Sequence, residues 1–369
     1  MTDSTATVVP VAALDVHAAS IRLAAVHRDE LLDERTLPFD HQLVARELRR
    51  LGVGRVCYEA GPTGFGLARH LLAAGIHCDV IAPGLVPWRS SDRVKTDRRD
   101  ARKLAVMYQG GMLQPIMIPG SGQEAVRDLM RAREDARHDR MRARHRIGKF
   151  VLRHGRRMPT SGWTLTRRQW LGSQTFEHAA QQAAFDDYLL ACDLIDRRIE
   201  TLEQQIDCWA KDDEFRELVG WLRCLRGVDT LTALGLVAEI GDFSRFKTAP
   251  EFMSYLGLVP SESSSGQQRR QGAITKTGNT HARRLLIEAA HNQRRRPARS
   301  GTIERRQHGQ PARVVARAQH AQTRLHKRWQ RMSSRGKHSN KIAAAVAREL
   351  AGHIWAIAND QPLRPTRPD

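Results

Sequence analysis

Four acidic residues in the first hundred positions have the type and spacing that metal-assisted phosphate chemistry requires. Asp15 stands near the end of the apolar run 8–16, Glu59 lies at the end of the strand candidate that begins at Arg55, and Asp97 and Asp100 are three residues apart. Four convergent carboxylates repel one another unless cations lie between them, and their hard oxygen atoms favour Mg²⁺ or Mn²⁺. Two such ions, about 3.5–4 Å apart, can clamp an in-line displacement at phosphorus.

Each of these acids also has a simpler explanation when it is taken alone. Asp97 and Asp100 fit the first turn of a helix, where the helix dipole favours negative charge. Asp15 can cap a turn, and Glu59, shortly before a Gly-Pro pair, can be a turn residue. Asp92 is a rival ligand, although it lies off the helix face that Asp97 and Asp100 would share.

A second group of reactive side chains follows much later in the chain. Three serines at 263–265 precede Gly266, and further glycines at 272 and 278 relieve steric limits on the backbone. Nearby side chains could bind the oxygens of a phosphate: Arg269, Arg270, Lys276 and Asn279. We expect these serines in a loop. Composition alone favours an ordinary Ser/Gly linker with solvated charges.

The elements that would position the acids read as an α/β domain, which we assign to residues 1–118. Strands are expected at 8–16, 21–27, 31–39, 55–60 and 77–82, and helices at 41–51, 65–74 and from about 100 to 108. Three strands, helix, strand, helix, strand, helix is the order of an RNase H-like domain with a mixed sheet. A central strand beside the first strand would bring Asp15 and Glu59 together.

The middle of the chain, residues 119–215, predicts a helical hairpin or coiled coil. An arginine-dense stretch at 124–150 is followed by a second helical stretch at about 176–209. The second stretch has an apolar stripe close to heptad spacing: Leu189, Leu190, Leu194, Ile195, Ile199, Leu202 and Ile206. Such a stripe serves a core or an oligomer contact. The arginine face either binds a nucleic-acid backbone or is simply solvated.

Residues 216–358 predict a mainly helical domain that carries the serine loop. The turn around Gly227 and Asp229 is similar to a helix-hairpin-helix phosphate site, although an ordinary helix turn explains it equally well. A basic stretch at 294–335 could lie on nucleic acid as a tail or a helix. The segment 342–357 has an amphipathic helical pattern. We expect a disordered tail at 359–369.

The overall composition points to a polyanionic partner. The 369 residues include 60 Lys and Arg against 40 Asp and Glu, a formal net charge of +20. A membrane surface could also attract this charge, but we expect no membrane partner, because no apolar run approaches the roughly 18–20 residues that span a bilayer. The first residues have no basic signal-peptide region. Five cysteines without a C-x-x-C pair argue against zinc or disulfides and fit the reducing cytoplasm.

Two groups of motifs, in this order and spacing, resemble one known family. The first group is A-L-D-V-H at 13–17, Y-E-A-G-P-T-G at 58–64 and K-T-D-x-x-D-A at 95–101. The second is G-L-x-P at 257–260, S-G at 265–266 and G-x-I-x-K-x-G-N at 272–279. Together they resemble the DEDD-type insertion-sequence transposases, relatives of the Piv/MooV DNA invertases and of the bridge-RNA-guided serine recombinases.

The resemblance implies an enzyme with a RuvC-like N-terminal domain that holds Mg²⁺ or Mn²⁺ through Asp15, Glu59, Asp97 and Asp100. It also implies a serine just before the S-G glycine as nucleophile, which is Ser265, with Ser264 as the alternative. The expected product is a covalent phosphoserine link to double-stranded DNA. The resemblance also implies a structured guide RNA as a partner. We expect a homo-oligomer, a dimer or tetramer, in which the coiled coil pairs the subunits.

Two other functions remain open on the residues alone. A Holliday-junction-type endonuclease would use the same four acids with water as the nucleophile, and a non-catalytic scaffold would only bind nucleic acid. Serine and carboxylates lie roughly 250 residues apart, so the transposase hypothesis needs a composite site, with two subunits as one possible source.

Overall fold

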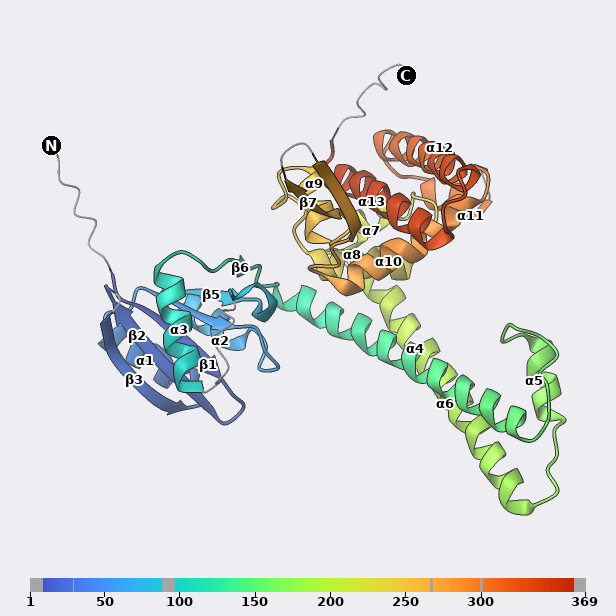
Figure 1. Cartoon of the computed structure of the whole chain (residues 1–369), viewed down its shortest axis with the longest axis horizontal. Helices are drawn as coiled ribbons and strands as arrows, with labels where there is room; N and C mark the ends of the chain where they lie inside the picture. The colour runs from blue at the N-terminus through green and yellow to red at the C-terminus, as the bar shows by residue number, and fades with distance from the viewer. Residues whose placement is uncertain (1–8, 29, 88–96, 266–267, 299–300, 362–369) are drawn as a thin grey trace. The chain divides into compact units, whose positions relative to one another are not determined.

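The computed structural model describes residues 9–28, 30–87, 97–265, 268–298 and 301–361, except for the side chains of 85, 97–100, 264, 265, 268 and 269. The chain divides into two units, residues 1–120 and 121–369, which are described separately below (Figure 1). In the described ranges, every helix is too short or too polar to span a lipid bilayer.

The first unit is built on a six-stranded mixed sheet in the order β3-β2-β1-β4-β5-β6. Its strands are β1 (Val11–Val16), β2 (Ser20–His27), β3 (Glu30–Pro38), β4 (Arg55–Glu59), β5 (His77–Ile81) and β6 (Pro115–Ile116). β1, β4 and β5 are parallel, whereas β2, β3 and β6 run antiparallel to their neighbours. The predicted mixed α/β sheet is therefore confirmed, with β4 beside β1.

Three α-helices and a short 3₁₀ turn, η1 (Pro83–Leu85), complete this unit: α1 (His41–Arg50), α2 (Gly66–Ala73) and α3 (Asp97–Gln109). Because side chains alternate along a strand, Leu14 and Tyr58 pack in one core cluster that includes residues of α1 and α2. Ala13 and Cys57 lie in the other cluster, together with Leu104 of α3. The sheet therefore has α1 and α2 on one face and α3 on the other.

The second unit begins with a long helical hairpin. It consists of α4 (Ser121–Arg153), the short α5 (Leu165–Gly172) and α6 (Ala179–Trp209). α4 and α6 are antiparallel, because Arg133 binds Glu203 whereas Arg144, further along α4, binds the earlier Asp196. The fully buried residues of α6 repeat every seven positions: Phe185, Cys192, Ile199 and Ile206.

Two leucines of the predicted stripe do not belong to this seam. Leu190 is 56% exposed and Leu194 is 53% exposed. They lie on a different face of α6 from Cys192 and Ile199, because neighbouring helical positions are about 100° apart. The part of the prediction that placed Leu190 and Leu194 in one seam with Ile199 is wrong.

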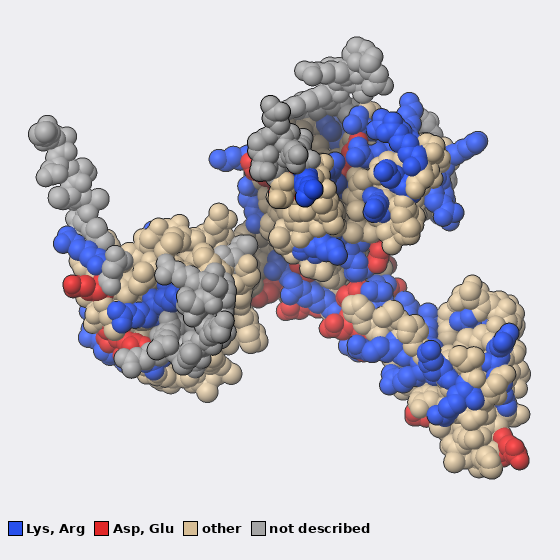
Figure 2. Space-filling view, viewed as in Figure 1, with Lys and Arg blue, Asp and Glu red and all other residues tan. Residues whose placement is uncertain are grey.

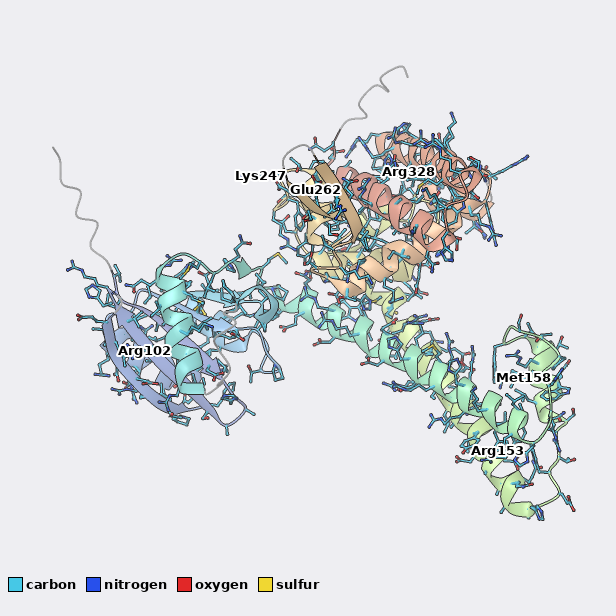
Figure 3. All side chains as sticks on the ribbon, viewed as in Figure 1. Arg102, Arg153, Met158, Lys247, Glu262 and Arg328 are labelled. Atoms are coloured by element: carbon cyan, nitrogen blue, oxygen red, sulfur yellow. The ribbon has the colours of Figure 1, made fainter. Side chains whose placement is uncertain are left out.

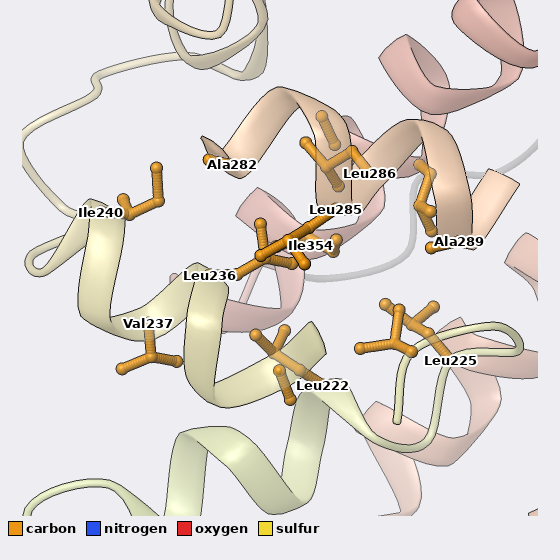
Figure 4. Packing of buried hydrophobic residues seen from close by; sticks show 14 of the residues in the cluster. Leu222, Leu225, Leu236, Val237, Ile240, Ala282, Leu285, Leu286, Ala289 and Ile354 are labelled. Carbon is orange, nitrogen blue, oxygen red and sulfur yellow. The ribbon is translucent and has the colours of Figure 1, made fainter. Parts of the chain in front are cut away.

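The rest of the second unit is mainly helical, as predicted. It contains α7 (Arg216–Leu222), α8 (Thr230–Ile240), α9 (Ala249–Tyr255), α10 (Thr280–His291), η2 (Asn292–Arg294), α11 (Gly301–Gln307), α12 (Ala312–Ser334) and α13 (Ser339–Ala358). Leu236, Leu285 and Ile354 meet in its core (Figure 4). Val126 and Met130 of α4 belong to the same core, so the start of the hairpin packs with these helices.

The structure of this unit tests the predictions for residues 216–369. The pattern at 342–357 forms α13, and its apolar stripe is buried: Ile342, Val346, Leu350 and Ile354. In the basic stretch 294–335, residues 301–307 and 312–334 form the helices α11 and α12. The Asp229 carboxylate accepts a hydrogen bond from the Thr232 amide at 2.8 Å, so it occupies the start of α8, where a phosphate would otherwise bind. Most of the expected tail, 362–369, lies outside the described residues.

Candidate active site

Asp15 and Glu59 occupy equivalent positions on neighbouring strands. The ladder between β1 and β4 ends at the pair Leu14 and Tyr58, and Asp15 and Glu59 are the next residue on each strand. Since Leu14 and Tyr58 face α1 and α2, alternation places both acids on the α3 face of the sheet. The predicted approach of these two residues therefore follows from strand order and register.

Both acids line one pocket of about 450 Å³. The segment 60–63, which follows β4, and the α3 residues Ala101, Lys103 and Leu104 line it too. The hydroxyl of Tyr58 donates to the carbonyl of Gly64 at 3.0 Å, which fixes the segment after Glu59 against the sheet. The pocket thus lies where the ends of two parallel strands meet the beginning of α3.

Asp97 and Asp100 lie on the first turn of α3, as predicted from their spacing. They precede Ala101 and Leu104, which are buried against the sheet, by one helical turn each. Their side chains are outside the described part, as is all of Asp92. Among the described side chains, no group of three or more His, Cys, Asp or Glu could hold a metal ion. The two described carboxylates offer hard oxygen donors of the kind that Mg²⁺ takes, and further ligands would have to come from elsewhere, such as α3.

His17 is a member of this pocket to which the sequence did not assign a role. Its Nε2 lies 3.2 Å from Oδ2 of Asp15. The motif A-L-D-V-H contained the signal, since His17 directly follows β1 and is two residues from Asp15, a spacing that brings side chains of extended backbone to the same face. Lys103 of α3 was also missed, because nothing in its local pattern separates it from an ordinary solvated lysine.

The serines lie on a strand, not in a loop as predicted. β7 (Pro260–Ser265) pairs antiparallel with β8 (Gln268–Ile274). In register, Ser263 lies opposite Arg270, Ser264 opposite Arg269 and Ser265 opposite Gln268. Serine's weak strand preference is overridden because residues 268–274 supply a full partner strand.

Two glycines permit the close approach that forms the base of this hairpin. Gly257 and Gly278 have φ values of +63° and +71°. A Cβ at Gly257 would lie 2.2 Å from the carbonyl oxygen of Thr277, and one at Gly278 would lie 1.9 Å from that of Tyr255. Only glycine fits at either position. The glycine of the G-L-x-P motif and the last glycine of G-x-I-x-K-x-G-N therefore serve one contact.

The buried side chain of Arg283, in α10, forms hydrogen bonds to both chain segments at the base of the hairpin. Its Nη1 donates to the carbonyls of Leu256 at 2.9 Å and Thr277 at 2.8 Å, and its Nη2 donates to the Thr280 hydroxyl at 3.1 Å. The residue is buried, and this burial lowers the pKa of its guanidinium. Arg283 thus joins the two chain segments that lead into and out of the serine hairpin.

The predicted phosphate-binding residues differ in their surroundings. Arg270 and Lys276 are exposed, and Lys276 has a φ of 57°. The side chain of Arg269 lies outside the described part. Asn279 has partners within the fold: its Oδ1 accepts from the Ala282 amide at 2.9 Å, and its Nδ2 donates to Glu239 at 2.7 Å. Both ends of this side chain are used in capping α10 and binding α8.

Glu239 is a buried carboxylate that the sequence did not single out. Arg131 donates to both its oxygens, at 3.0 and 3.2 Å, and Asn279 adds a third hydrogen bond. Burial raises the pKa of Glu239, but the bonds from Arg131 and Asn279 outweigh burial, so the pKa lies below its ordinary value. A charged Glu239 therefore holds α4, α8 and the start of α10 together.

Comparisons with known proteins agree with the placement of both motif groups. A family model described as "Transposase IS116/IS110/IS902 family" matches residues 221–307, and a DEDD transposase model of IS110 type matches residues 11–154. A relative from Sinorhizobium fredii, named "Putative transposase y4qE", is 40% identical over 82% of this chain and 75% of its own. The transposase for insertion sequence element IS1533 of Leptospira borgpetersenii is 33% identical over 88% of this chain and 96% of its own.

Proposed function

The chain belongs to the IS116/IS110/IS902 family of transposases, and from this premise we propose that it cuts and rejoins DNA through a covalent phosphoserine intermediate. It is an enzyme of DNA transposition. The observation that supports the serine chemistry is the pairing of β7 with β8, which places Ser263 and Ser264 opposite Arg270 and Arg269, and Ser265 beside them opposite Gln268.

We assign the metal-holding role to the first unit, as a RuvC-like DEDD domain. Asp15, Glu59, Asp97 and Asp100 would hold a divalent ion, Mg²⁺ or Mn²⁺, and the shared pocket of Asp15 and Glu59 supports this assignment. Such an ion, when bound, neutralises charge that builds on phosphate oxygens. His17, at 3.2 Å from Asp15, is positioned to orient that carboxylate.

The proposed nucleophile is Ser265, with Ser264 as the alternative. The serine oxygen forms a bond to phosphorus as the bond from phosphorus to the departing sugar oxygen breaks, and the hydroxyl proton passes to a base. Arg270 and Lys276, both exposed near the hairpin, would bind the phosphate oxygens. Arg283 and Asn279 would hold the hairpin in place, and Asn279 would also lie beside the bound nucleic acid.

Partners and setting form the rest of the proposal. The net charge of +20 suits double-stranded DNA and a structured guide RNA alike. We propose a homo-oligomer, with the hairpin region 119–215 pairing subunits and residues 216–358 presenting the serine. All five cysteines are described and free, which agrees with action in the cytoplasm.

A denaturing gel tests this function. The protein is incubated with Mg²⁺, labelled element-end DNA and the adjoining non-coding RNA, and wild type is compared with Ser265→Ala and Ser264→Ala. We expect a denaturant-resistant protein–DNA band that is lost only in Ser265→Ala, whereas loss only in Ser264→Ala moves the nucleophile by one residue. Cleavage without any such band would point to hydrolysis by water, and no metal-dependent cleavage at all would point to a binding scaffold.

A further inference from the structure

A basic groove lies on the helical hairpin, apart from the residues assigned to catalysis. It has a volume of about 570 Å³, and α4 lines it with Arg142, His145, Arg146, Lys149 and Arg153. All five are exposed. Lys and Arg side chains gather along the hairpin (Figure 2), and Arg153 lies at the very end of α4 (Figure 3).

Three cations of this groove, Arg146, Lys149 and Arg153, differ from the arginines earlier on the same helix. In the first part of α4, Arg131 binds Glu239 and Arg133 binds Glu203. In the part of the hairpin that the structure describes, Arg146, Lys149 and Arg153 form no ion pair, and the lining of the groove contains no carboxylate. The first arginines therefore hold the fold together, and Arg142 at the start of the groove pairs with Asp139. Arg146, Lys149 and Arg153 have no such ion pair in the described part of the hairpin.

The cations of the groove are spread along one face of α4 and are not clustered at a single place. Arg142, Arg146, Lys149 and Arg153 recur every three or four residues, which is one face of a helix. With a rise of about 1.5 Å per residue, neighbours are about 4.5–6 Å apart along the axis and the row is about 16 Å long. A single small anion would use one or two of these charges, while a phosphodiester chain lying along α4 would use them all.

Two aromatic residues form the remaining wall. Phe150 is buried, and its ring meets the edge of the Tyr188 ring of α6 at a centroid distance of 5.6 Å. Tyr188 is half-buried and lines the groove. Cations that follow a backbone beside an aromatic ring that can stack on a base suit single-stranded nucleic acid, because the bases of a duplex have no free face.

We propose that this groove binds a single-stranded segment of nucleic acid, with phosphates along the α4 row and a base against Tyr188. The site goes beyond the proposed cutting and joining reaction, since it contains neither the carboxylates nor the serines. Single-stranded RNA and single-stranded DNA both offer the phosphates and bases that the groove would recognise. Comparing the affinity of the groove for each of them identifies its natural ligand.

Fluorescence anisotropy of the full chain with labelled oligonucleotides tests the proposal. Unstructured single-stranded RNA, single-stranded DNA and a duplex of the same sequence are titrated in EDTA, so that catalysis does not contribute. The main variant is Arg146→Ala with Lys149→Ala. The matched control is Arg197→Ala with Lys211→Ala, which removes the same charge from exposed positions of the hairpin region outside the groove.

We expect the groove variant to weaken single-strand binding several-fold and to lower the slope of log affinity against log salt by about 1.4, the value for two lost phosphate contacts. Tyr188→Leu should weaken single-strand binding about tenfold and leave duplex binding unchanged. Thermal unfolding of each variant checks that the hairpin is intact. Equal losses in the groove and control pairs, or a loss confined to the duplex, would overturn the proposal whether or not the chain cuts DNA.

Discussion

The side-chain amide of Asn279 donates to the buried carboxylate of Glu239 at 2.7 Å. Asn279 ends the segment that leaves the serine hairpin, and Glu239 lies in α8, so this bond ties the hairpin to the helical core. The same amide side chain caps α10 through its oxygen. One residue of the G-x-I-x-K-x-G-N motif therefore performs two structural tasks.

Replacing Asn279 by alanine should cost more stability than the loss of a helix cap alone. An N-cap is worth about 0.5–2 kcal/mol, and a hydrogen bond to a charged group about 1.5–3 kcal/mol. Thr248→Ala is the matched control, because Thr248 caps α9 only. Urea denaturation should show Asn279→Ala to be about 1.5–3 kcal/mol more destabilising than Thr248→Ala, and equal losses would argue against the tie to Glu239.

Arg283→Met should destabilise the second unit, because it keeps the apolar length of the side chain but leaves the carbonyls of Leu256 and Thr277 without their donor. Each unsatisfied buried group costs about 1–3 kcal/mol. Arg216→Met is the control, since Arg216 is 67% exposed and its ion pair with Asp213 lies at the surface. A midpoint of urea unfolding that moves no further for Arg283→Met than for the control contradicts the role given to Arg283.

Stability should fall as the pH falls from 6.5 to about 4, in part because of His353. Burial between α12 and α13 lowers the pKa of His353 from 6.5 to about 4. The folded protein thus favours the neutral ring, and above pH 6.5 the contribution of His353 to the free energy of unfolding is complete. As the pH falls below 6.5 the unfolded chain takes up the proton first, and up to ~3 kcal/mol of that free energy is lost. His353→Leu should flatten unfolding free energy across this range, whereas the exposed His308→Leu should not. An unchanged profile in His353→Leu would refute this assignment.

The carboxylate pocket should govern metal dependence. Asp15→Asn and Glu59→Gln remove one negative charge each from the pocket at almost constant volume. We expect a loss of DNA cleavage of at least about 10² and the loss of any rise in melting temperature with added Mn²⁺. Glu30→Gln, at an exposed position of β3, controls for charge. If Asp15→Asn protein still cleaved DNA and were still stabilised by Mn²⁺, the assignment of Asp15 to a DEDD metal site would be contradicted.

The first unit was predicted well because its signals are local. Alternating apolar residues mark each strand, and Gly52 and Gly75, with φ values of +64° and +80°, follow the ends of α1 and α2 as expected. The predicted order of strands and helices also predicted which strands are neighbours in the sheet. β4 pairs with β1, which brings Asp15 and Glu59 to the same edge of the sheet. The contact of His17 with Asp15 needed no long-range information and could have been inferred from their spacing.

Predictions that depended on distant partners were less complete. Serines at 263–265 look like a turn, and only the pairing with 268–274 makes them a strand. Asn279 looks exposed in sequence, but its amide meets Glu239, forty residues earlier. Leu190 and Leu194 match an apolar pattern, yet the seam that contacts α4 runs through Cys192 and Ile199. Local patterns do not reveal which face a neighbour covers.

Mass spectrometry of the trapped intermediate is the most direct measurement of the central claim. The protein is incubated with Mg²⁺, the guide RNA and element-end DNA, denatured, trimmed with nuclease and digested with a protease. We predict a nucleotide-linked peptide that contains residues 260–269, with the added phosphate on Ser265 or, one position earlier, on Ser264. Cleaved DNA with every peptide of β7 unmodified, or an adduct on a residue outside the serine hairpin, would contradict the phosphoserine mechanism.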